Sequence, residues 1–313
     1  MSLLLWLAVL VSPILFAVSN ILNKRMVHGE EDDSNSLSLI AIESLFILPL
    51  VIILGLFCMM TGRIPGAEIF VPLFFNGMSF TLYVWLFYQA LKKEEASRVV
   101  PWFQIIPAFG FVGGILMLNE NMSWYAILAI ILLMAGGFVL SVVKGKVKWK
   151  VIAMMVLASA LCAWNDLVLA KYGRELLVSP GSSLTNILES TKDIAPALFA
   201  DLLGKLFFGT IFLVCRTERR GFVLGVKTKF KLVFGSNAAF TLGTFVFDCA
   251  KIFAPVAIVQ ALCCTQPLFV LIGAVVLTIF HKSFLEEEIS GKTLVQKIVG
   301  VGLMVVGGIL LSI

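Results

Sequence analysis

Ten apolar segments of about 20 residues each, separated by short polar breaks, take up almost all of the 313 residues. A helix needs about 20 mostly apolar residues to cross the hydrocarbon core of a bilayer. The sequence therefore predicts an all-α integral membrane protein with no separate soluble domain. The ten predicted transmembrane helices are residues 3–22, 37–59, 70–91, 97–118, 123–143, 150–170, 194–215, 232–252, 254–280 and 294–313.

The composition agrees with this prediction and excludes several other classes. Apolar residues make up 60% of the chain and charged residues 14%, which is far too little charge for a soluble domain of this size. The net charge of +5 comes from short basic runs between spans, so we expect no nucleic-acid partner. Cysteines without CxxC spacing and two distant histidines predict no metal site, and we expect no cofactor.

Basic residues also predict the orientation in the membrane. Counted together with the residues at the span ends that border them, the odd-numbered loops hold 18 Lys and Arg residues and the even-numbered loops hold 5. Because cytoplasmic loops are enriched in basic residues, we expect the odd loops to be cytoplasmic and both termini to lie outside, in a plasma (inner) membrane. The apolar N-terminus lacks a basic start and a small-residue cleavage site, so we expect it to be retained as the first span.

The second half of the chain repeats the first. Four residues recur exactly 160 positions later, and spans 1 and 6 overlay at an offset of 147; the four are Ala90, Thr81, Pro107 and Gly113, which recur as Ala250, Thr241, Pro267 and Gly273. We therefore predict two repeats of five helices, residues 1–145 and 146–313. An odd number of spans makes the second repeat enter the membrane from the opposite side, so the two repeats should be inverted relative to each other.

Two blocks of residues carry a family resemblance. The first runs through Tyr88-Gln-Ala-Leu-Lys92, Ala96, Pro101, Pro107, Leu118-Asn-Glu-Asn-Met-Ser123 and Ala135-Gly-Gly137, and the second through Asp248-Cys-Ala-Lys-Ile252, Ala254-Pro255, Gln266-Pro267, Glu286-Glu-Glu-Ile-Ser290 and Val306-Gly-Gly308. These blocks resemble the repeat of EamA-type transporters in the drug/metabolite transporter (DMT) superfamily. Asn119 replaces the usual glycine before Glu120, and residues 281–285 are inserted. The resemblance implies ten spans and transport of small solutes such as amino acids.

Polar residues inside two of the predicted spans indicate where a site lies. In span 8, the steps of 4, 3, 4 and 3 place Asn237, Thr241, Thr244, Asp248 and Lys251 on one helical stripe. Such a stripe either lines a cavity or bonds neighbouring helices, and the acid favours the cavity.

In span 6, Asp166 shares a stripe with Ser159 and Cys162, and Trp164 and Asn165 beside it would supply an aromatic wall and an amide. Asp166 could hold a substrate ammonium, carry a coupling proton or pair with a lysine.

Each of the other intramembrane polar residues and prolines has two possible roles. Asp201 and Lys205, four residues apart, favour a structural ion pair over substrate contact. Glu43 either faces the site or reaches the membrane interface. Helix kinks at Pro101, Pro107 and Pro267 would free backbone groups toward a cavity, where Gln104, Gln260 and Gln266 accompany them, or would serve packing alone.

Aligned positions that hold different residues in the two repeats are further site candidates, because residues that bind a substrate need not be the same in both repeats. The offsets place Tyr88 opposite Asp248, Gln104 opposite Cys264, and Ser19 opposite Asp166. Asn20, next to Ser19, completes the set of candidates for substrate binding or coupling.

These observations favour a secondary transporter that moves a small polar metabolite, with amino acids or other ammonium-bearing solutes preferred, by alternating access. Proton coupling through Asp166 or Asp248 is an added hypothesis. A flippase for an amphiphilic or lipid-linked substrate is the alternative. A membrane-embedded enzyme is a distant one, because no catalytic constellation is present. Glycines in spans 5 and 10 leave a monomer and a homodimer both open.

Overall fold

The computed structural model describes residues 3–27, 36–93, 99–141, 148–177, 187–214, 216–266, 268–270, 272–273 and 291–312. Within these ranges every regular element is a helix. The elements are α1 (Leu3–Val27), α2 (Ser36–Leu45), α3 (Leu48–Thr61), α4 (Ala67–Leu91), η1 (Val100–Ile105), α6 (Ile106–Leu118), α7 (Trp124–Ser141), α8 (Trp149–Leu177), α9 (Ile187–Thr210), η2 (Ile211–Val214), α10 (Arg216–Phe253), α11 (Val256–Cys263) and α13 (Gly291–Ser312).

Among the described residues, four helices are long and apolar enough to cross a membrane. They are Ile40–Thr61, Ala67–Ala90, Trp149–Leu177 and Asp193–Val214. Shorter apolar helices cover Leu10–Leu22, Trp102–Leu118, Trp124–Val139, Val256–Val270 and Ile298–Gly307. Each of these nine helices overlaps one of the predicted spans, and α10 covers the remaining one, residues 232–252.

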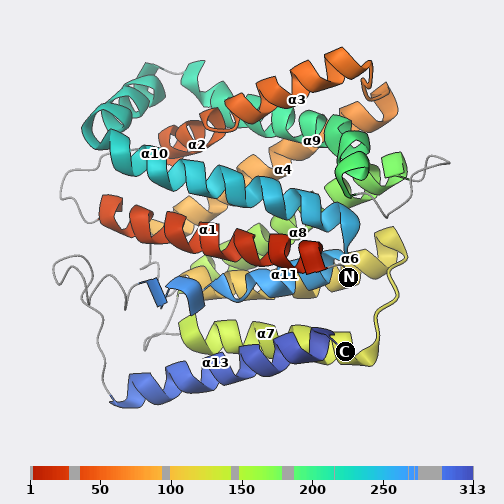
Figure 1. Ribbon diagram of the computed structural model, residues 1–313. Helices are drawn as coiled ribbons and strands as arrows, with labels where there is room; N and C mark the ends of the chain where they lie inside the picture. The colour runs from red at the N-terminus through yellow and green to blue at the C-terminus, as the bar shows by residue number, and fades with distance from the viewer. Residues whose placement is uncertain are drawn as a thin grey trace.

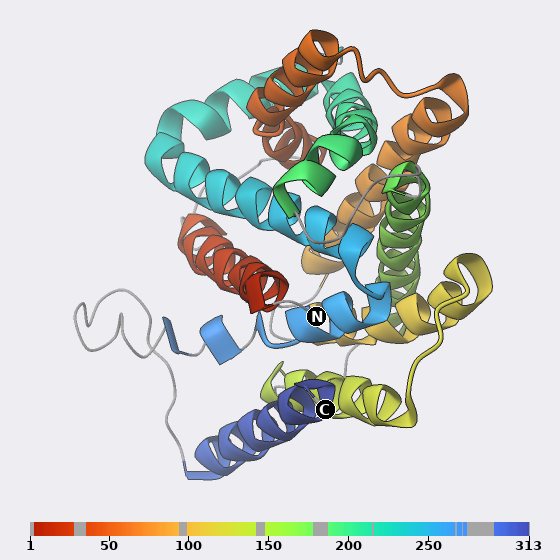
Figure 2. The same cartoon turned by 45° about the vertical axis from the view of Figure 1, so that its right-hand side comes forward.

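The helices lie side by side, and both termini are at the same end of the bundle (Figures 1 and 2). The helix α4 packs on α8 and α9, whereas α10 packs on α1 and α2. The helices α7 and α13 form a pair at one side of the bundle (Figure 1). The helices α4 and α10 therefore each pack on helices of the other half. The inverted ten-helix arrangement itself stays a prediction.

Two predicted helices are interrupted, each near a proline. The second predicted span divides at Phe46 and Ile47 into α2 and α3, and Pro49 lies in the first turn of α3. The fourth divides into the 3₁₀ helix η1 and the α-helix α6, and Pro107 lies in the first turn of α6. Proline has no N–H and therefore suits a first turn, where that group has no partner within the helix.

The structure corrects the predicted kinks and one loop. Pro101 and Pro107 begin helices instead of kinking a continuous one. The prolines inside helices are Pro13, Pro72 and Pro196, in α1, α4 and α9. The predicted loop over residues 216–231 is the first part of α10. Pro267 lies outside the described residues.

The helices α4 and α9 join the two halves in backbone contact. A Cβ atom added at Gly77 would overlap backbone atoms of Gly204 and Lys205, and one added at Gly204 would overlap the backbone of Phe74. Small residues let membrane helices approach this closely. The contact sets the position of Lys205 against α4.

We expect Gly77→Ala to destabilise the protein by about 1–3 kcal/mol, because the overlapping atoms are backbone and cannot rotate away. The measurement is thermal unfolding of the purified protein in detergent. Gly302→Ala in α13 is the matched control, since a Cβ atom there meets nothing within 4 Å. Equal unfolding temperatures for the two variants would contradict the prediction.

Candidate functional site

Five charged side chains from three helices form a continuous chain of ion pairs inside the bundle. Lys251 of α10 pairs with Asp166 of α8, and its Nζ lies 2.6 Å from Oδ1 of Asp248. Lys205 Nζ of α9 lies 3.0 Å from Oδ2 of Asp248 and 2.7 Å from Oδ2 of Asp201. Aspartates and lysines therefore alternate along the whole chain. We call these five residues the charge network.

The charge network is fully buried. None of its five side chains is more than 5% exposed. Removing a charge from water costs several kcal/mol, which its partners must offset. Three carboxylates face two ammonium groups, so the network carries one negative charge more than it balances when all five groups are ionised.

Amide side chains extend the network to two further helices. Gln260 Nε2 of α11 donates to Oδ2 of Asp166 at 2.7 Å, and Asn76 Nδ2 of α4 donates to Oδ1 of Asp201 at 3.0 Å. Asn165 Nδ2 donates in turn to the carbonyl of Asn76 at 3.1 Å. One polar system thereby joins α4, in the first half, to α8, α9, α10 and α11 in the second.

Aromatic rings lie against both lysines. Lys205 Nζ lies 5.1 Å from the ring centre of Phe80, and Lys251 Nζ lies 4.5 Å from that of Phe247. Rings at this range stabilise a desolvated ammonium through the negative face of the π system. The surroundings of the network thus suit cations as well as anions.

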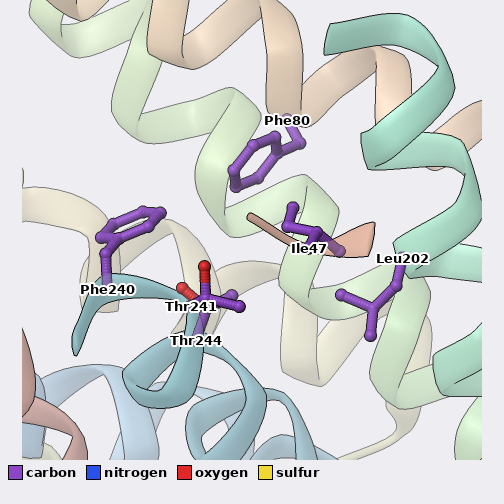
Figure 3. A pocket seen from close by; sticks show the side chains of 6 residues that line it. All are labelled: Ile47, Phe80, Leu202, Phe240, Thr241 and Thr244. Atoms are coloured by element: carbon purple, nitrogen blue, oxygen red, sulfur yellow. The ribbon is translucent and has the colours of Figure 1, made fainter. Parts of the chain in front are cut away.

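The polar stripe predicted on α10 has Asp248 and Lys251 in the charge network, and two of its threonines line a small hollow. Thr241 and Thr244 line this hollow with Ile47, Phe80, Leu202 and Phe240 (Figure 3). Its volume of about 10 Å³ matches the space of one water molecule. The buried Thr241 hydroxyl has no hydrogen-bond partner among the described residues. Asn237 instead donates to the carbonyl of Val233 in its own helix.

A second acidic group lies in the first half. The Tyr88 hydroxyl of α4 donates to Oε1 of Glu43 on α2, and both side chains are partly buried. No ion pair of Glu43 occurs among the described residues. Glu43 therefore faces a neighbouring helix instead of the membrane interface, and its contact there is a hydroxyl.

Several predicted site residues lie elsewhere. Trp164 is 51% exposed, because successive residues of a helix point about 100° apart and Asp166 takes the inner face. Asn20 is exposed, while Ser19 binds Ser236 of α10 through their hydroxyls at 3.0 Å, a contact that bonds two helices. Gln104 is buried beside Gly137, outside the network. Gln266 is partly buried, and within the described ranges no contact joins it to the network.

An ion pair between Arg174 and Glu120, which we call the clamp, was not predicted from the sequence. Arg174 Nη1, near the end of α8, lies 2.7 Å from Oε1 of Glu120, and the same oxygen accepts from the Val256 N–H at 3.2 Å. Three nitrogens of Arg174 make four hydrogen bonds in all, to this carboxylate and to three carbonyls at the end of α10, those of Lys251, Ile252 and Ala254. A cation at a helix C-terminus and an anion at a helix N-terminus are both favourable.

Asn119 forms the turn that brings Glu120 to Arg174. It ends α6 with φ of 51°, in the left-handed region that Asn adopts more readily than most residues. The Glu120 N–H then bonds the carbonyl of Gly114 at 3.0 Å. The asparagine in place of glycine therefore keeps the turn that carries Glu120.

Comparisons with known proteins agree with this architecture. A solved structure titled "Crystal structure of protein" aligns with a TM-score of 0.55 and 18% identity over 97% of this chain and 96% of that chain, which shows a shared fold. No curated protein matches at a significant level. The sequence model of the EamA-like transporter family matches residues 3–142. With its long apolar helices, the chain is an integral membrane protein, and its residues 3–142 are similar to the EamA-like transporter family, which is part of the DMT superfamily.

Proposed function

We propose that this protein is a secondary transporter that moves a small, ammonium-bearing metabolite such as an amino acid across the membrane. The match to a transporter family supports transport of the DMT type. The buried charge network supports the site, because ionisable groups inside a membrane bundle are costly and usually belong to a solute or ion pathway.

The charge balance of the network is the observation that favours an ammonium-bearing solute. Three aspartates share two lysines, so one further positive charge completes the balance. A substrate ammonium bound at Asp166 or Asp248 would supply that charge. A zwitterion fits best, since its carboxylate could take the place of an aspartate on Lys205 or Lys251.

Alternating access would proceed by movement of the two halves around this network. The helix α4 of the first half touches the network through Asn76, whereas the other members come from α8 to α11. Hydrogen bonds across this boundary can break and re-form at modest cost. The basic-residue count supports odd loops on the cytoplasmic side.

We expect Asp166→Asn to reduce uptake about ten- to hundredfold, because hydrogen bonds to charged groups contribute about 1.5–3 kcal/mol and the variant removes the charge. Uptake of tritiated L-serine, L-leucine, L-lysine and putrescine into proteoliposomes is the measurement. Asp193→Asn, in a surface pair with Arg63, is the matched control.

A thermal-unfolding curve separates loss of transport from loss of fold. Asp166→Glu, which keeps the charge, should restore part of the uptake. If the wild type moves none of the four solutes, or if Asp166→Asn transports as well as the wild type, the proposed solute class or site is wrong.

Proton coupling is tested separately through the acids that could carry the proton. We expect an inward proton gradient to accelerate wild-type uptake and to have little effect on Glu43→Gln, because glutamine keeps the Tyr88 contact but cannot bind the proton. Uptake with and without the gradient gives the comparison. Wild-type uptake that ignores the gradient would remove proton coupling from the proposal, and an undiminished gradient effect in Glu43→Gln would exclude Glu43 as the proton carrier.

A further inference from the structure

Tyr83 lies on α4 between the two acidic groups described above. The helices α4 and α8 run antiparallel, since Leu73 packs in one cluster with Leu169 while Ala90 packs in another with Val151. Asn76 Nδ2 fixes their register with a 2.9 Å hydrogen bond to the carbonyl of Asn165. Two helical turns further along α4, Tyr83 is therefore level with residues 158–162 of α8.

The ring of Tyr83 is packed, but its hydroxyl is not engaged. The ring meets that of Phe80 edge-on, with centres 5.1 Å apart, and lies in one cluster with Tyr88 and Phe240. The side chain is only partly buried, and no hydrogen bond to it occurs among the described residues. A tyrosine hydroxyl inside a protein usually has a partner. The Tyr88 hydroxyl, five residues on, has one in Glu43.

Acids from three helices lie near Tyr83. Glu43 of α2, Asp166 of α8 and Asp248 of α10 all lie within electrostatic range of it. The first acid belongs to the first half of the chain, and the other two belong to the charge network of the second half. Phe80, which touches the Tyr83 ring, also faces Lys205 and lines the small hollow.

We propose that Tyr83 is a substrate-contact residue that recognises the amino group of the solute, an assignment that rests on the transport function proposed above. The phenol oxygen accepts a hydrogen bond from the substrate ammonium while the carboxylates on either side balance its charge. Tyr83 thereby gives the site its preference for amines over alcohols and acids of the same size.

The first test is Tyr83→Phe, which removes one oxygen atom and leaves the ring contact with Phe80. We expect KM for the best transported of the four tritiated solutes to rise about tenfold, with Vmax and the unfolding temperature unchanged. Tyr125→Phe, on an exposed ring at the start of α7, is the matched control. Unchanged KM in Tyr83→Phe, alongside impaired Asp166→Asn, would overturn the role of Tyr83 while leaving the proposed transport intact.

The second test needs no known solute. Tyr83→Cys and Tyr125→Cys, each in a cysteine-free background, are treated with 2-aminoethyl and 2-sulfonatoethyl methanethiosulfonate. We expect the ratio of the cationic to the anionic rate to be about tenfold higher at position 83, because the neighbouring carboxylates concentrate cations there. Equal ratios at the two positions, or no reaction at position 83, would contradict the proposal even if transport is found.

Discussion

The desolvation of the charge network is the constraint on which the arrangement of the second half depends. A single buried aspartate or lysine would be strongly unfavourable, so each charge must meet an oppositely charged partner at hydrogen-bonding distance. Asp248 and Lys251 are one turn apart on α10 and meet two different helices, α9 and α8. Rotation of α10 about its axis would separate both pairs at once. The network therefore fixes the rotation of α10, and with it the direction in which Thr241 and Thr244 point.

The clamp and the charge network act on the same residues from two sides. Arg174 binds the carbonyl of Lys251. The side chain of Lys251 pairs with Asp166, which lies about two turns before Arg174 on α8. Glu120 holds the first N–H of α11, the helix that brings Gln260 to Asp166. Because Glu120 comes from the first half and Arg174 from the second, the movement of the halves proposed above would strain this junction. The position of Lys251 and Gln260 around Asp166 is thus coupled to a contact at the end of the bundle.

Helical periodicity made part of this site predictable. The stripe on α10 and the isolated acid Asp166 follow from spacing and from the cost of charge in a bilayer, and Asp166 lies in the buried network with two residues of the stripe, Asp248 and Lys251. Spacing cannot show which helix faces which, so neither the pairing of Lys251 with Asp166 nor the exposure of Trp164 could be predicted. The clamp was hidden for a second reason: Arg174 lies near a helix end, where a basic residue is ordinarily assigned to the membrane surface. The two interrupted helices each divide near a proline, and sequence pattern alone does not show whether a proline kinks a helix or begins a new one.

The repeat gives the differences between the halves a physical meaning. Tyr88 and Asp248 occupy the same position at the offset of 160, and each contacts the second helix of its own half, through Glu43 on α2 and through Lys205 on α9. Equivalent positions of the two repeats thus hold a tyrosine bonded to an acid in the first half and an acid paired with a lysine in the second. In the pair of Tyr88 and Glu43, only Glu43 is an acid. The pair of Asp248 and Lys205 is part of a network with five ionisable groups. A solute between the halves would therefore meet unequal electrostatic surroundings on its two sides, and an amine is oriented by such a difference. In the proposed transporter, symmetry of the backbone would allow the halves to exchange conformations, and asymmetry of these side chains would let the site distinguish one end of a solute from the other.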